Sequence, residues 1–132
     1  MFGQFQVRTR ARCEMIDITR EVSGELKKMS AVSGLCNVYV SHTTAGVTIN
    51  ENADPDVRRD ILAGLERIAP ERGDYLHGEG NSPAHIKSSL IGAAAAVIVY
   101  EGRLVLGTWQ SIFFCEFDGP RQRTVYVKFI AG

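Results

Sequence analysis

The stretch "TWQSIFFCEFDGPRQRTVYVKFI", residues 108–130, contains two β-rich runs on either side of a group of turn residues. Thr108–Phe117 and Arg123–Ile130 are dense in aromatic and β-branched side chains, which favour extended strands. Asp118-Gly119-Pro120 lies between them and is typical of a turn. We therefore predict that the two runs pair as one long antiparallel hairpin.

Upstream of this stretch, the sequence alternates between strand-like and helix-like segments. Further strands are expected over Phe5–Thr9, Cys13–Ile18, Leu35–Val40, Val47–Ile49 and Ala93–Tyr100, and the last of these is expected to be buried. Apolar stripes of helical period predict helices over residues 17–29, 54–69 and 82–90. Asp54 and Ser82 each precede a proline and are expected to cap the second and third helices.

The order of these elements favours one fold class. No regular strand–helix–strand repeat is present, which argues against a parallel sheet. A chain of 132 residues suits one domain with one main core. We predict a single domain over residues 1–132, with a β-rich antiparallel α+β sandwich and two or three helices.

The composition excludes several classes of partner. Fifteen basic and fifteen acidic side chains cancel, so the chain lacks the long-range field that attracts nucleic acids or anionic lipids. The longest uncharged apolar run, Leu90–Tyr100, is short beside the roughly 20 residues of a membrane span. Cys13, Cys36 and Cys115 form no paired motif, which fits a reducing compartment. We expect a cytoplasmic protein with no nucleic-acid or membrane partner.

The chain has three histidines, His42, His77 and His85, and each lies at the end of a predicted element beside polar residues. Imidazole serves either as a metal ligand or as a base near neutral pH. Their spacing matches no local metal-binding signature, so two alternatives stay open. They are either a shared site or three unrelated surface histidines.

Other polar residues offer chemistry at these junctions. Asn50 and Glu51 directly follow a buried-looking strand, and they need partners if they are covered. Lys87 lies near the start of the third helix, where free backbone N–H groups favour an anion such as phosphate. Arg121 and Arg123 flank a predicted turn, where they either clamp a phosphate or are simply solvated.

Three long blocks together carry a resemblance to a known family. They are "SHTTAGVTINENADPDVRRD" at residues 41–60, "HGEGNSPAHIKSSLIG" at 77–92 and "GTWQSIFFCEFDGPRQR" at 107–123. In this order they resemble the signature blocks of the YjbQ family, often described as secondary thiamine-phosphate synthases. The resemblance implies a compact β-rich α+β fold, a homotrimer, and a polar pocket in which the three histidines converge.

The resemblance also suggests which residues form the site. The family's recurring polar residues correspond here to Asn50, Glu51, His85, Lys87, Gln110, Glu116 and Arg121. From these residues and the converging histidines, we expect His42, His85, Glu51 and Glu116 to be catalytic. Asn50, Lys87, Gln110 and Arg121 are expected to bind a small phosphorylated substrate. The three histidines, His42, His77 and His85, are expected to bind a divalent ion, zinc or magnesium.

Three functions follow as hypotheses. The first is an enzyme of the thiamine-phosphate synthase type, which joins a pyrimidinylmethyl diphosphate to a thiazole phosphate and releases diphosphate. The second is a metal-dependent hydrolase in which three histidines hold zinc and Glu51 or Glu116 activates water. The third is a non-catalytic trimeric module that binds a metal or a small molecule.

Overall fold

The computed structural model describes all 132 residues and contains eight strands and three helices. The strands are β1 Phe2–Arg8, β2 Glu14–Asp17, β3 Gly34–Val40, β4 Ala45–Glu51, β5 Ala94–Tyr100, β6 Arg103–Leu104, β7 Gln110–Glu116 and β8 Gln122–Ala131. The helices are α1 Thr19–Lys28, α2 Pro55–Ile68 and α3 Ser82–Ile91.

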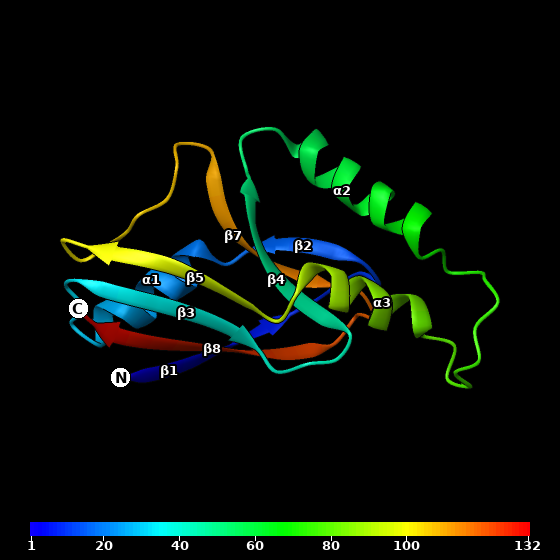
Figure 1. Ribbon diagram of the computed structural model, residues 1–132, viewed down its shortest axis with the longest axis horizontal. Helices are drawn as coiled ribbons and strands as arrows, with labels where there is room; N and C mark the ends of the chain where they lie inside the picture. The colour runs from blue at the N-terminus through cyan, green and yellow to red at the C-terminus, as the bar shows by residue number, and fades with distance from the viewer.

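These strands form two antiparallel sheets that face each other (Figure 1). The larger sheet has the order β1-β8-β3-β5-β6, and the smaller has the order β2-β7-β4. Buried apolar side chains from both sheets and from α1 form one main core of 17 residues. The predicted fold class, a β-rich antiparallel α+β sandwich, is therefore confirmed.

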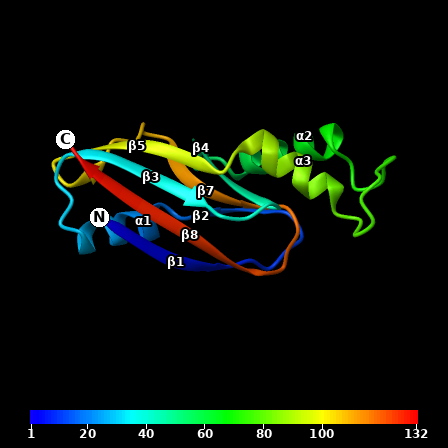
Figure 2. The ribbon, with the colours of Figure 1, turned by 60° about the horizontal axis from the view of Figure 1, so that its bottom comes forward.

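The predicted hairpin at residues 108–130 is wrong in its pairing. β7 is the central strand of the smaller sheet, between β2 and β4, whereas β8 lies between β1 and β3 in the larger sheet (Figure 2). The connection crosses from one sheet to the other, and its backbone bonds to the segment after β1: Thr9 N–H donates to the Arg121 carbonyl, and Gly119 N–H to the Arg12 carbonyl. The turn residues thus change sheets instead of closing a hairpin.

Burial on both faces explains why β7 is a central strand. Ile112 and Phe114 point into the main core, while Phe113 and Cys115 point into a second core. Residues of α2 and α3 contribute to that second core, so these helices pack over the outer face of the smaller sheet. A strand covered on both faces and paired on both edges has no edge left for β8.

The helix boundaries agree with the capping signals in part. Asp54 caps α2, because its Oδ1 accepts a hydrogen bond of 2.9 Å from Asp56 N–H. α3 has Asn81 at its N-cap rather than Ser82, and the Asn81 carbonyl accepts hydrogen bonds from the third and fourth residues of the helix. Gly92 ends α3 at φ 98°, in the left-handed region that favours glycine.

The outer face of the larger sheet is exposed and apolar. β5 was expected to be buried, but only alternate residues, Val97 and Val99, face the core. Ala94, Ala96, Ile98 and Tyr100 are exposed, because no element covers this side of the sheet. The exposed large apolar side chains of this sheet are Phe2, Leu35, Tyr39, Ile98, Tyr100 and Ile130.

Among the three helices, none has the length and apolar character that crossing a membrane would require.

Candidate functional site

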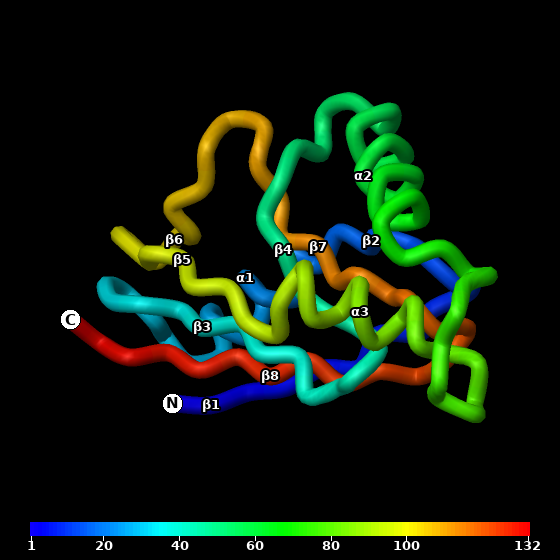
Figure 3. Tube along the Cα trace, turned by 45° about the vertical axis from the view of Figure 1, so that its right-hand side comes forward, coloured from blue at the N-terminus to red at the C-terminus, as the bar shows by residue number.

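Three segments that are distant in the sequence meet at one end of the molecule: the loop after β3, the loop that leads into α3, and the connection from β7 to β8 (Figure 3). Between them lies an open cavity of about 480 Å³. None of its lining residues is hydrophobic. They are Ser41, His42, Thr43, Thr44, His77, Glu79, Asn81, His85, Asp118, Arg121 and Arg123. We call this space the histidine cavity.

All three histidines of the chain line this cavity. The rings of His77 and His85 meet edge to face, with centroids 5.5 Å apart. His42 also lines the cavity, and its Nε2 accepts a hydrogen bond of 2.9 Å from Thr124 N–H. The fold therefore brings together side chains that are 35 and 8 residues apart in the sequence.

The contact with Thr124 decides the protonation of His42. Because Nε2 accepts a hydrogen bond, the proton of the neutral ring is on Nδ1. Burial and the positive charge of Arg123 lower the pKa of His42 below its usual value, outweighing the opposing charge of Glu116. His42 is therefore a neutral side chain at pH 7 whose Nδ1–H is available as a donor.

The same contact bears on the expected metal site. No group of three or more histidine, cysteine, aspartate or glutamate side chains has an arrangement that could hold a metal ion. His42 cannot bind a metal through Nε2 unless it gives up the hydrogen bond from Thr124. Imidazole binds a metal through an unprotonated nitrogen, and in His42 that nitrogen is engaged. The three rings in this arrangement do not fit a three-histidine metal site.

Arg123 and Glu116 form a buried ion pair behind the cavity. Glu116 is fully buried and Arg123 is 5% exposed. Arg123 donates from Nε to Glu116 Oε1 at 2.9 Å and from Nη2 to Oε2. Glu116 also accepts from the Thr9 hydroxyl at 2.7 Å and from the backbone N–H groups of Phe117 and Asp118 at 3.1 and 3.0 Å.

These donors determine the charge of Glu116. Burial alone would raise the pKa of its carboxyl group, but the hydrogen bonds from Arg123, Asp118 N–H and Thr9 outweigh it and lower the pKa below the usual value. Glu116 therefore stays ionised and has no free oxygen directed at the cavity. Its role in the structure is to hold Arg123, which does line the cavity.

One nitrogen of the Arg123 guanidinium group is not used in hydrogen bonds to the protein. Its Nη2 also donates to the Thr44 hydroxyl at 2.8 Å, so Nε and Nη2 are both engaged. Its Nη1 makes no hydrogen bond to the protein. Arg123 thus presents a fixed cationic donor from the inner wall of the histidine cavity.

Asp118 holds two other residues of the lining in place. Its Oδ2 accepts hydrogen bonds of 3.0 Å from both Asn81 Nδ2 and Arg121 Nη2. Burial would raise the pKa of Asp118, but these two donors and the charges of Arg121 and Arg12 lower it. The Oδ1 of Asn81 is buried and has no hydrogen-bond partner. An acceptor in that state is unusual in a folded protein and marks a position where a ligand or water can donate.

Asn50, Glu51 and Gln110 are not in this cavity. They lie at the far end of the β4–β7 pair, where Glu51 pairs with Gln110, while Ala45 pairs with Glu116 beside the cavity. The six residue steps of extended strand from Ala45 to Glu51 span about 20 Å. Within one chain, the structure therefore separates these three side chains from the histidines.

Lys87 also lies outside the cavity lining. Its side chain is 2% exposed, and its Nζ is 2.8 Å from Glu66 Oε1 and 3.9 Å from Glu71 Oε1. Its charge is thus already balanced by carboxylates on α2 and on the following loop. The predicted site residues that do line the cavity are His42, His77, His85 and Arg121.

Sequence reasoning missed the inner wall of the cavity. Arg123 was expected beside a turn, where it would either clamp a phosphate or be solvated, whereas it is two and four positions before Val125 and Val127, which face the core. Glu116 likewise follows Phe114 by two positions. The period of two was a usable signal that both charged residues point inward and so require partners.

Comparison with known proteins gives consistent matches over nearly the whole chain. The family model described as "UPF0047 protein YjbQ-like" matches residues 3–132. The UPF0047 protein YugU of Bacillus subtilis is 54% identical, over 97% of this chain and 98% of that protein. A UPF0047 protein of Methanocaldococcus jannaschii is 48% identical, over 98% of this chain and 94% of that protein.

Solved structures agree with the fold. An uncharacterized conserved protein from Clostridium acetobutylicum is 51% identical, with a TM-score of 0.95 over 97% of this chain and 99% of that chain. A YbjQ-like protein of unknown function from Sulfolobus solfataricus is 32% identical, also with a TM-score of 0.95, over 100% of this chain and 97% of that chain. The arrangement of two sheets and three helices is therefore shared by these proteins.

Proposed function

The chain belongs to the UPF0047 YjbQ-like family, and on this premise we propose that the histidine cavity binds the phosphate group of a small substrate. The family model covers all three segments that line the cavity. The solved relatives are described as uncharacterized or of unknown function. The proposal therefore depends on the chemistry of this chain's own cavity.

One observation supports it above the others: the lining is wholly polar and carries two arginines and three histidines, while the carboxylate of Asp118 is already paired with Arg121 and Asn81. Arg123 presents Nη1, Arg121 lies at the rim, and neutral His42 carries its proton on Nδ1. The hydroxyl groups of Ser41 and Thr43 add further donors. A phosphate at neutral pH offers acceptors and negative charge, which are the complement of these groups.

The reaction that we propose is of the thiamine-phosphate synthase type. The bond between the pyrimidinylmethyl carbon and the diphosphate oxygen breaks, and diphosphate leaves with the electron pair. The thiazole nitrogen then bonds to that carbon and becomes cationic. No proton leaves this nitrogen, so the site must stabilise the charge of the leaving group rather than supply a strong base. Arginine and imidazole donors in a fixed arrangement suit that demand.

The test is direct. Purified protein is incubated with hydroxymethylpyrimidine diphosphate and thiazole phosphate, and both thiamine phosphate and released diphosphate are measured. We expect Arg121→Gln to lower kcat/KM by about 10- to 100-fold, the magnitude of a lost hydrogen bond to a charged group. His85→Ala and His42→Gln are expected to reduce turnover as well.

Arg59→Gln is the matched control, because Arg59 is an exposed residue of α2 outside the cavity. It should leave turnover unchanged. Full activity in His85→Ala and Arg121→Gln would refute the proposal that the histidine cavity is the site of this reaction. Binding of the phosphorylated substrates without product would instead support a non-catalytic binding module.

A metal-dependent hydrolase receives less support from this arrangement. Glu116, one of the two expected bases, is ionised and fully committed to Arg123, Thr9 and the backbone. Glu51, the other, lies at the far end of β4. Neither carboxylate is among the residues that line the histidine cavity. Elemental analysis of protein purified without added metal tests the predicted divalent ion, and one zinc per chain would establish it.

We also propose that the outer face of the larger sheet is the contact between copies in a homotrimer. This face exposes Leu35, Ile98, Tyr100 and Ile130, a contiguous apolar area of the kind that marks interfaces. Light scattering should give about three times the chain mass of 14.5 kDa. Ile98→Lys should reduce that mass, whereas a wild-type monomer would refute the proposal. A cytoplasmic location stays a prediction that fractionation would test.

A further inference from the structure

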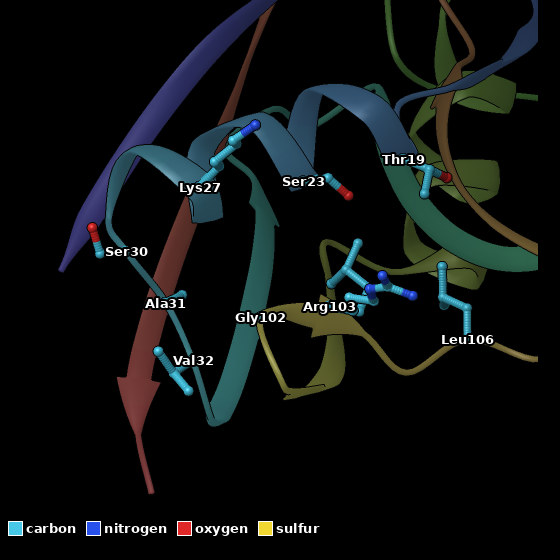
Figure 4. Close-up of a pocket in the computed structure, with 10 residues that line it drawn as sticks. Thr19, Ser23, Lys27, Ser30, Ala31, Val32, Gly102, Arg103 and Leu106 are labelled. Atoms are coloured by element: carbon cyan, nitrogen blue, oxygen red, sulfur yellow. The ribbon is translucent and has the colours of Figure 1, made fainter.

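A second and larger cavity, of about 620 Å³, lies between α1 and the turn that joins β5 to β6 (Figure 4). It shares no residue with the histidine cavity. Its lining residues are Thr19, Ser23, Lys27, Ser30, Ala31, Val32, Gly102, Arg103, Leu104 and Leu106. We call it the α1 cavity. Its volume lies within the range of small-molecule sites.

The two walls of the α1 cavity come from regular elements. Thr19, Ser23 and Lys27 are spaced four residues apart on α1, which places them along one side of the helix. The opposite wall is the β5–β6 turn, where Gly102 N–H donates to the Val32 carbonyl at 2.9 Å. That bond ties the turn to the segment after α1. The cavity is thus framed by hydrogen-bonded backbone.

The charges on the lining are of one sign. Lys27 and Arg103 contribute two cations, and no acidic residue lines the cavity. Neither cation forms an ion pair, whereas neighbouring Lys28 is bonded to Glu25 at 2.9 Å. The whole chain is neutral, with fifteen charges of each sign. The α1 cavity is therefore a local site of unbalanced positive charge.

Apolar and hydroxyl groups complete the lining. Ala31 is buried in the main core, and Leu104 and Leu106 pack against that core while also facing the cavity. The Thr19 hydroxyl oxygen accepts a hydrogen bond of 2.9 Å from Ile112 N–H, so its own proton is available for an acceptor. A ligand in this space would meet cations and hydroxyl donors together with an apolar surface.

We propose that the α1 cavity binds a small amphipathic anion, a carboxylate or phosphate attached to an apolar group. Lys27 and Arg103 bind the anionic group, and Ser23 adds a hydrogen bond. The apolar part lies against Ala31, Leu104 and Leu106. Both parts contribute, because exposed cations alone hold an anion weakly in physiological salt, and an apolar surface alone does not select for charge.

The experiment is a titration of ¹⁵N-labelled full-length protein followed by two-dimensional NMR. The probes are benzoate, phenyl phosphate, neutral benzyl alcohol and inorganic phosphate. We expect benzoate or phenyl phosphate to shift the amide signals of Ser23, Lys27 and Gly102 in a saturable way. Benzyl alcohol and inorganic phosphate should bind at least tenfold more weakly, because each lacks one half of the required chemistry.

Variants identify the groups responsible. Lys27→Gln and Arg103→Gln should each weaken benzoate binding about fivefold or more, and the double variant should abolish saturation. Both residues are exposed, so the spectra of these variants should keep their dispersion. Lys28→Gln is the matched control and should bind like the wild type, because Lys28 is next to Lys27 but does not line the cavity.

Several results would overturn the proposal. Equal affinity for benzyl alcohol and benzoate would show that the α1 cavity does not select ligands by their negative charge. Shifts confined to residues of the histidine cavity, such as Thr43 and His85, would place anion binding there only. Absence of any shift in the α1 cavity would mean that the space takes no such anion, and this outcome is independent of the thiamine-phosphate assay.

Discussion

Removing the charge of Glu116 should destabilise the fold more than any other conservative change near the histidine cavity. Glu116→Gln keeps the size of the side chain but replaces one carboxylate oxygen with an amide group that can only donate. Oε1 accepts from Thr9 and Arg123, and Oε2 accepts from Arg123 and two backbone N–H groups. In one orientation the amide nitrogen faces Arg123 Nε–H, and in the other it faces Arg123 Nη2–H and two backbone N–H groups, so at least one N–H donor faces another donor.

The magnitude follows from burial. Glu116 is fully buried, and Arg123, at 5% exposure, becomes a buried cation without a counter-charge. Breaking a buried pair by removing one partner costs about 3–5 kcal/mol. This is a large part of the roughly 5–15 kcal/mol that stabilises a typical domain. We expect the urea midpoint of Glu116→Gln at pH 7 to fall accordingly, with the protein still folded in the absence of urea.

The dependence on pH provides an independent check. The pKa of Glu116 is lowered in the folded state, relative to an ordinary value of 4.5. Its stabilising contribution is therefore complete above about pH 4.5 and is lost as the pH falls through the lower, folded-state pKa. The wild type should lose stability in that acidic window, and Glu116→Gln should lose less there.

Asp60→Asn is the matched control, because Asp60 is exposed on α2 and forms no ion pair. Its free energy of unfolding should stay within about 0.5 kcal/mol of the wild type. Arg123→Gln combined with Glu116→Gln should lose less than the sum of the two single variants, because the unpaired charge is removed. A change below about 1 kcal/mol in Glu116→Gln, or strict additivity in the double variant, would refute the reasoning.

Three further predictions concern single residues. His42 should titrate below its usual value of 6.5 in an NMR pH series, and because its neutral form is favoured in the folded state, its contribution to stability should be lost as the pH falls below about 6.5. Lys87→Met should leave phosphate affinity, measured by calorimetry, within about twofold of the wild type, since Lys87 does not line the histidine cavity. Gly46→Ala should destabilise the protein to urea by about 1–3 kcal/mol, because the added Cβ would lie 2.6 Å from the Gly92 carbonyl oxygen; an unchanged midpoint would contradict this close approach.

Much of the local structure could be predicted from the sequence. The Asp54-Pro55 pair predicted the start of α2, and the cap hydrogen bond is present. The helix expected over residues 82–90 corresponds to α3, which spans Ser82–Ile91 and ends before Gly92. These signals are readable because caps and left-handed turns depend on residues a few positions apart, whose geometry is set by the backbone itself.

The residues of the candidate site could be predicted from the sequence only in part. Period two could have placed Arg123 and Glu116 on inward faces, and a buried arginine needs a buried carboxylate. The same reasoning could not separate Glu51 from Glu116, because Glu51 follows Ile49 by two positions just as Glu116 follows Phe114. Their different environments depend on the register of β4 against β7, which puts them at opposite ends of the pair.

By itself, the sequence determined the strand-like runs, the approximate extents of the three helices, and the neutral, single-domain character of the chain. Only the tertiary structure decided that β7 and β8 separate into different sheets and that three distant histidines line one cavity. The physical reason is the separation along the chain of the residues that interact. Side-chain period and capping are properties of neighbouring residues, whereas strand partners and cavity walls are chosen by burial and hydrogen bonding between segments far apart in the chain.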